Sequence, residues 1–208
     1  MNKINLLFIL FFFSFLCSIA QPTVEEELRS ALKKKPRLDF KLDSRNTFIS
    51  QSGVRVFGIK LGLSFDNKLA FGLGYNELLS NVKSDAVYQG GNYKSRLGYS
   101  YLSPYMDYTF YRDDKWELSI PVQFGIGETY YHTQIGGKGI NFAKGIVLSY
   151  EPAITFQYKI LSYFGVGAGV GYRLMVIRNY AVKEDFTSPV YLFKFKIYFQ
   201  DVYQDIFR

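Results

Sequence analysis

Apolar and polar residues alternate strictly along three long stretches of this sequence. From Trp116 the chain reads WELSIPVQFGIG, so every second residue to Ile126 is apolar, and the positions between are mostly polar or small. The pattern recurs from Ile146 to Tyr158 and from Tyr191 to Phe199. A period of two predicts β-strands with two different faces, because successive side chains of a strand point to opposite sides. We therefore expect an all-β fold.

The alternation and the turn residues together predict eight strands, at 38–48, 54–65, 69–79, 97–111, 116–131, 144–158, 163–177 and 188–200. Short connections at 66–68, 112–115 and 159–162 alternate with longer polar ones at 80–96, 132–143 and 178–187, and the connection near 51–53 is also short. Short periplasmic turns, longer external loops and an even strand number are typical of outer-membrane barrels. We expect an antiparallel up-and-down transmembrane β-barrel with its longer loops outside the cell.

The first twenty residues have the features of a secretory signal peptide. Lys3 precedes the apolar run Leu6–Leu16, and Ser18-Ile19-Ala20 supplies the small residues of a cleavage site before Gln21. A membrane anchor is the alternative, but Leu6–Ala20 is shorter than the roughly 20 residues of a spanning helix. Cys17, the one cysteine, would leave with this segment, so the mature chain offers no disulfide and no thiolate metal site.

The chain is thus expected to comprise a signal peptide (1–20), a periplasmic N-terminal segment (21–36), the barrel (37–200) and a periplasmic tail (201–208). Within 21–36, Thr23 and Glu26 form the pattern of a capping box, Glu25–Glu27 lie in a first turn and Lys33–Lys35 in a last turn, and Pro36 follows. This favours a short helix, with a charged, unstructured leader as the alternative.

A barrel of eight strands can be a soluble carrier with its apolar face inward or a membrane barrel with that face outward. The polar face here carries alternating glycines, Gly72 and Gly74 on one strand and Gly165–Gly171 on another. Glycine weakens a solvated strand but leaves room for large neighbours in a narrow lumen. Several expected strands also exceed ten residues, which suits a tilted membrane strand of about 9 to 11.

These features favour the membrane barrel, with aromatic residues near strand ends at the membrane interfaces: Trp116, Tyr108, Phe110, Tyr158, Phe164 and Tyr130.

The signal peptide, the cysteine-free mature chain, the alternating strands, the glycine-rich inner face and the final strand YLFKFKIYF resemble the OmpA/OmpX-type small outer-membrane barrels. The resemblance covers about residues 37–200. It implies a multi-pass outer-membrane location among lipid and lipopolysaccharide. It also implies recognition by the barrel-insertion machinery, with Phe199 as the terminal aromatic residue of the signal that this machinery reads.

Extending the alternation to the inner face places five acids and six bases in the lumen: Asp39, Lys41, Asp43, Arg45, Lys60, Asp107, Glu117, Glu151, Arg173, Lys194 and Lys196. An unpaired charge in a narrow lumen is costly, so we expect cross-lumen ion pairs, and a filled lumen argues against a wide pore. A turn near residue 161 would pair residue 151 with about 171, which puts Arg173 diagonally opposite Glu151. The candidate site is this ion-pair network, chiefly Lys60, Asp107, Glu117, Glu151, Arg173, Lys194 and Lys196.

Three functions fit this reading. The first is a structural or surface-interaction barrel. The second is a narrow channel or a component of an envelope transport or secretion system. A lipid-modifying enzyme comes third and would need the one histidine, His132, as general base, with Ser149 or Glu151 brought near it by the fold.

We predict no catalytic residue, no cofactor and no metal site. Asp113-Asp114 is typical of a hairpin turn, and GVGAGVG is not followed by the helix of a phosphate loop. The net charge of +7 falls to +6 without Lys3 and is spread along the chain. An anionic lipid surface and an envelope or surface protein are therefore better candidate partners than nucleic acid.

Overall fold

The computed structural model describes residues 23–161 and 163–198. The expected signal peptide (1–20), the expected tail (201–208) and Phe199 lie outside these residues. The described elements are α2 (Val24–Leu32), β1 (Arg37–Ile49), β2 (Ser52–Phe65), β3 (Leu69–Leu78), β4 (Lys83–Tyr88), β5 (Gly91–Arg112), β6 (Trp116–Ile135), β7 (Lys138–Leu161), β8 (Phe164–Ile177) and β9 (Ser188–Ile197).

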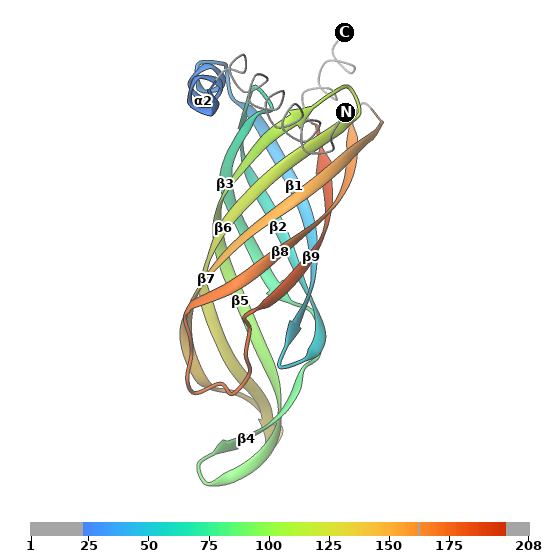
Figure 1. Cartoon of the computed structure of the whole chain (residues 1–208). Coiled ribbons are helices and arrows are strands. Elements are labelled where there is room, and N and C mark those ends of the chain that lie inside the picture. The colour runs from blue at the N-terminus through green and yellow to red at the C-terminus, as the bar shows by residue number, and fades with distance from the viewer. Residues whose placement is uncertain (1–22, 162, 199–208) are drawn as a thin grey trace, which may run out of the picture.

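Eight of these strands close into an antiparallel barrel, as Figure 1 shows. Neighbours in sequence pair with each other except β3 and β4; β1 pairs with β9, and β3 pairs with β5 to complete the ring. The fourth strand, β4, pairs only with β5 and stands outside the ring. The predicted all-β, eight-stranded barrel is therefore confirmed.

The barrel strands begin and end near the predicted residues except in β5, β6 and β7, which are 22, 20 and 24 residues long. Their extra residues lie in segments that we expected to be loops. Polar side chains occupy both faces there, so the alternation that predicts a strand is missing. The β6–β7 hairpin turns at Gly136 and Gly137, with φ of 58° and 81°, which glycine adopts without strain.

The two ends of the barrel differ in their connections. Residues 66–68 and 113–115 form tight turns at one end, called here the short-turn end. Asp113 shapes one of them, because its carboxylate accepts hydrogen bonds from the backbone N–H groups of Lys115 (2.8 Å) and Trp116 (2.7 Å). The other end, called here the loop end, carries the connections 50–51, 79–90, 136–137 and 178–187.

The helix α2 lies at the short-turn end, beside the barrel (Figure 1). Thr23 caps it, accepting a hydrogen bond from the backbone of Glu26 (3.4 Å). The helix ends at Leu32, so Lys33–Lys35 follow it instead of forming its last turn, which holds Arg29. Within the described residues no helix is long and apolar enough to cross a membrane.

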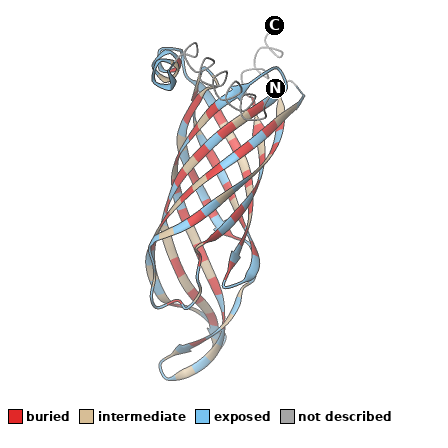
Figure 2. Cartoon of the chain, in the orientation of Figure 1, coloured by how far each residue is buried: buried red, intermediate tan, exposed pale blue. Residues whose placement is uncertain are grey.

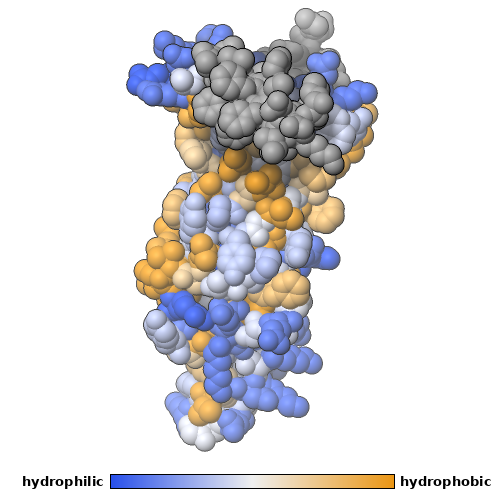
Figure 3. All heavy atoms as spheres, viewed as in Figure 1, coloured by the Kyte–Doolittle hydropathy of each residue, from blue (hydrophilic) through white to orange (hydrophobic). Residues whose placement is uncertain are grey.

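Burial alternates along every barrel strand, as Figure 2 shows. In β9, Leu192 and Lys194 are buried, whereas Tyr191 and Phe193 between and beside them are exposed. Large apolar side chains thus cover the outer wall, and charged ones fill the inside. Figure 3 shows apolar residues on the wall and mainly hydrophilic ones beyond it at the loop end.

Glycines on the inner face make room for an aromatic side chain, as expected. Gly62 of β2 pairs with Gly72 of β3, and Tyr105 of β5 lies over both. A Cβ atom on Gly72 would stand 2.7 Å from the Tyr105 ring and would overlap the carbonyl oxygen of Leu61. The lumen is therefore too crowded here for any side chain at residue 72.

Candidate functional site

Arg45 of β1 lies at the centre of the lumen and is fully buried. Its Nε donates to Glu151 (2.8 Å), and its two terminal nitrogens each donate to one oxygen of Asp43 (2.9 and 2.8 Å). They also donate to Asn76 (2.6 Å) and Gln123 (2.9 Å). All five guanidinium N–H groups are thus used, which meets the condition for burying such a charge.

Glu151 of β7 joins this arginine to a second one. Its other carboxylate oxygen accepts a hydrogen bond from Nε of Arg173 (3.0 Å), and the rings of Tyr99 and Tyr101 lie 5.6 and 5.9 Å from that guanidinium. Cations are attracted to aromatic faces at such distances. The carboxylate and two rings therefore surround Arg173.

The expected register between β7 and β8 was wrong by two residues. Ala153 pairs with Gly171 and Tyr150 with Leu174, so Glu151 stands directly opposite Arg173 and not diagonal to it. The cause is the position of the turn: Leu161 pairs with Phe164 and Lys159 with Gly165, so the hairpin is centred about one residue later than 161 and every pairing shifts by two. Directly opposed side chains are the closest pair on a sheet face, which explains the short contact.

A second group of charges lies nearer the short-turn end. Asp107 of β5 accepts from Lys41 (3.0 Å) and lies 3.5 Å from Lys194, and Lys41 also pairs with Asp39 (2.7 Å). Lys60 belongs to the first group, because it pairs with Asp43 (3.1 Å), and its Nζ lies 5.0 Å from the ring of Tyr105.

The third group surrounds Glu117 of β6. This carboxylate accepts hydrogen bonds from Lys196 (3.1 Å) and from the hydroxyl of Tyr198 (3.1 Å), and Arg112 lies 3.5 Å away. All seven residues of the candidate network thus face the lumen and contact an opposite charge. The sequence reasoning missed the neutral partners Asn76 and Gln123, although both stand on the inner face of their strands.

An apolar cluster fills the lumen towards the loop end, and the sequence analysis did not anticipate it. Side chains of seven strands, including Val56, Leu97 and Tyr131, pack there with Val182 and Phe186 of the connection 178–187. That connection folds inward: the ring centroids of Phe186 and Tyr99 are 4.9 Å apart.

Hydrogen bonds fix the same connection. The hydroxyl of Tyr131 donates to Glu184 (2.5 Å) and accepts from the backbone N–H of Lys183 (3.1 Å). At the short-turn end, the pocket beside Asp107 and Glu117 holds about 10 Å³, roughly the space of one water molecule. The described part of the lumen is thus filled from one end to the other.

The strands β4, β5, β6 and β7 continue past the barrel as a projecting sheet, defined here as residues 83–97 and 131–147. The barrel strand β8 pairs with β7 only as far as Leu148, so β7 residues before it have no strand partner on that side among the described residues. The other edge belongs to β4, which pairs on one side only. Figure 1 shows this sheet extending well beyond the barrel.

A polar groove of about 530 Å³ lies on the outer side of this sheet, where the rings of Tyr130 and His132 lie over Gly98 and Gly139. His132 lines it, with Nδ1 2.6 Å from the side-chain oxygen of Asn141. Ser149 and Glu151 are buried on the inner face. The fold therefore does not bring His132 to either residue that we named for an enzyme, and no described cluster of three or more His, Cys, Asp or Glu could hold a metal.

Comparison with solved structures finds similar barrels. Neisserial surface protein A is similar over 79% of this chain and 96% of its own, with a TM-score of 0.50 and 12% identity. Ail of Yersinia pestis, in complex with the heparin analogue sucrose octasulfate, is similar over 78% of this chain and 98% of its own. Its TM-score is 0.49 and its sequence identity is 12%. No protein-family model and no curated protein matches the sequence. At such identity the likeness to surface protein A shows the fold alone.

Proposed function

We propose that this chain, which has the fold of the small eight-stranded outer-membrane barrels, is an integral outer-membrane protein. Its closed barrel anchors the projecting sheet, and the sheet is an interaction surface outside the cell. The observation that carries the proposal is the length of β7: it has 24 residues, where a tilted strand needs about 9 to 11 to cross a bilayer.

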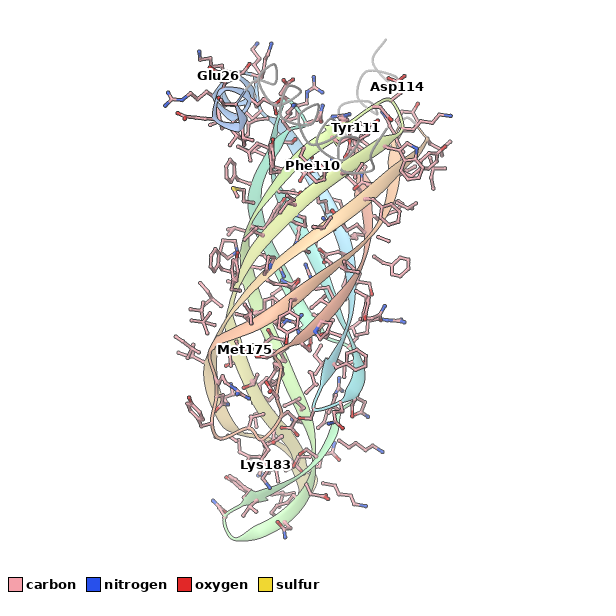
Figure 4. The ribbon with its side chains drawn as sticks, viewed as in Figure 1. Glu26, Phe110, Tyr111, Asp114, Met175 and Lys183 are labelled. Atoms are coloured by element: carbon pink, nitrogen blue, oxygen red, sulfur yellow. The ribbon has the colours of Figure 1, made fainter. Side chains whose placement is uncertain are left out.

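The outer wall supports the membrane location. Large apolar side chains are exposed around it, among them Leu73 (64%), Phe193 (62%) and Ile154 (58%). Soluble monomers rarely expose a continuous apolar surface of this size, whereas lipid covers it fully. The aromatic residues Phe110 and Tyr111 stand near Asp114 at the short-turn end (Figure 4), where aromatic rings suit a membrane interface.

The filled lumen favours a barrel that anchors the projecting sheet over a barrel that conducts solutes. Ion pairs occupy its middle and one end, and the apolar cluster with Phe186 occupies the other. A conducting path would have to separate these contacts. We therefore rank the channel second, to be tested by conductance.

The projecting sheet supports the interaction role, because it has two open edges. A closed barrel has none, but β4 and residues 138–142 of β7, before the contact of Asn179 with Ala143, present backbone N–H and C=O groups that an extended segment of another protein could pair with. The expected partner is therefore an envelope or surface protein that adds a strand.

A photo-crosslinking amino acid at Val87 of β4 tests this function in intact cells. Val87 is 61% exposed on the projecting sheet, and Leu73 of the wall, 64% exposed, is the matched control. We expect protein adducts from Val87 and lipid adducts alone from Leu73. Protein adducts at neither residue would contradict the interaction role.

A further inference from the structure

The helix α2 is fixed to the side of the barrel at the short-turn end. The carboxylate of Glu27 accepts hydrogen bonds from Nζ of Lys68 (2.8 Å) and from the hydroxyl of Tyr108 (3.3 Å), and Ala31 is 1% exposed. Figure 1 shows the helix almost end-on while the barrel axis runs vertically. The helix axis therefore lies across the barrel axis, in the plane that a membrane surface would take.

One side of this helix is apolar and only partly covered. Val24, Leu28 and Leu32 follow at intervals of four residues and form a single stripe. Val24 is 56% exposed and Leu32 49% exposed. Glu26, labelled in Figure 4, follows Val24 by two residues, a rotation of about 200° around the helix, and so belongs to the opposite side.

A group of basic residues follows the stripe. Lys33, Lys34, Lys35 and Arg37 are all exposed, and none of them makes an ion pair with a described residue. Two of the three acids of the helix are paired elsewhere, Glu25 with Arg29 (2.8 Å) and Glu27 with Lys68, so Glu26 alone is left to offset these four charges.

We propose that α2 and residues 33–37 form a membrane anchor that binds anionic phospholipid in the periplasmic leaflet. The stripe enters the boundary between headgroups and acyl chains, and the basic residues contact the lipid phosphates. An exposed apolar stripe beside uncompensated positive charge is the pattern of an interfacial helix. The inference rests on the proposed membrane location of the barrel.

The position of α2 along the barrel axis supports lipid as its binding partner. Tyr108 faces outward next to Phe110, which is 43% exposed, and the two belong to the aromatic residues expected at the interface. Because Glu27 binds Tyr108, the helix is held at that level, beside the wall that lipid would cover.

The test places a fluorophore on the helix of the full chain carrying Cys17→Ser, folded into phosphatidylcholine vesicles with or without phosphatidylglycerol. Leu32→Cys carries the label on the stripe, and Glu26→Cys is the matched control. Lipids brominated on their acyl chains quench only a label in the bilayer. We expect quenching of the Leu32→Cys label and little at Glu26→Cys.

The basic residues are tested with Lys33→Gln, Lys34→Gln and Lys35→Gln. Each substitution should lower the ratio of bound to free helix about five-fold in anionic vesicles and leave it unchanged in neutral ones. Equal, weak quenching of both labels, in a barrel that still migrates as a folded band, would contradict lipid binding by α2 and leave the membrane location of the barrel standing. A chain that never enters the vesicles would overturn the membrane location as well.

Discussion

Glu151 is shared between two arginines in the lumen. One carboxylate oxygen accepts from Arg45 and the other from Arg173, and Glu151 is 3% exposed. The two arginines do not depend on it equally. Arg45 also binds Asp43, whereas Arg173 has Glu151 as its one carboxylate partner among the described residues.

Removal of Glu151 should therefore cost more than removal of Arg173. We expect Glu151→Leu to lower the free energy of unfolding by about 3 to 5 kcal/mol, because Arg173 is left buried without a counter-charge. Arg173→Met should cost less, since Glu151 keeps Arg45, and the double variant should recover most of the Glu151→Leu loss. Urea titrations of the folded barrel measure this, and simple additivity of the two single effects would show that the residues are not coupled.

The glycine pair under Tyr105, Gly62 and Gly72, gives a second prediction. Gly72→Ala should destabilise the barrel by about 1 to 3 kcal/mol, the usual cost of overpacking, because backbone atoms of β2 cannot move away from the new Cβ. Gly53→Ala is the control, since nothing lies within 4 Å of its Cβ position. Equal urea midpoints for both variants would contradict the crowding at residue 72.

At the scale of elements, the contact between α2 and the barrel should depend on pH. The hydrogen bond from Lys68 holds the pKa of Glu27 below its usual value. A carboxyl with a lowered pKa stabilises its contact fully above its ordinary pKa and loses that contribution as the pH falls through the lowered value. Helix α2 should thus detach in acid.

Hydrogen exchange of residues 24–32 at neutral and acidic pH measures this detachment. The variant Glu27→Gln should exchange faster at neutral pH and lose most of the pH dependence. Protection that stays constant in the original chain down to strongly acidic pH would contradict the role of Glu27.

The sequence predicted the strands of the barrel wall well, because an apolar outer face and a charged lumen impose a period of two. It did not predict the outer parts of β5, β6 and β7, where polar side chains stand on both faces and the contrast between the faces disappears. It placed the lumen charges correctly on the inner face. It could not assign partners such as Asn76 and Gln123 to Arg45, because those contacts depend on how strands far apart in sequence are aligned around the ring.

At the scale of the whole molecule, the filled lumen predicts a barrel that does not conduct. Planar bilayers containing the protein should show no single-channel steps. Phe186→Ala should not open a path either, because the charged groups around Arg45 still block the lumen below it. Regular conductance steps in the original chain would favour a channel over a barrel that only anchors the projecting sheet.

The two ends of the barrel predict its orientation. Epitope tags at Gly136 or beside the exposed Tyr180, both at the loop end, should be reachable by antibody on intact cells. A tag at Asn67, in a short turn, should be reachable only after the outer membrane is opened. The reverse pattern would invert the proposed topology and would place α2 outside the cell.

The charges of the lumen also constrain how such a chain could enter a bilayer. Lys194 and Lys196 of β9 find their acids on β5 and β6, and Lys41 of β1 finds Asp107 on β5. A strand that crossed hydrocarbon alone would carry these ammonium groups and its unpaired backbone into lipid. Lys194 and Lys196 are neutralised only once these distant strands have met around the ring. Insertion and closure therefore have to proceed together, and a half-assembled barrel has no stable resting place in the membrane.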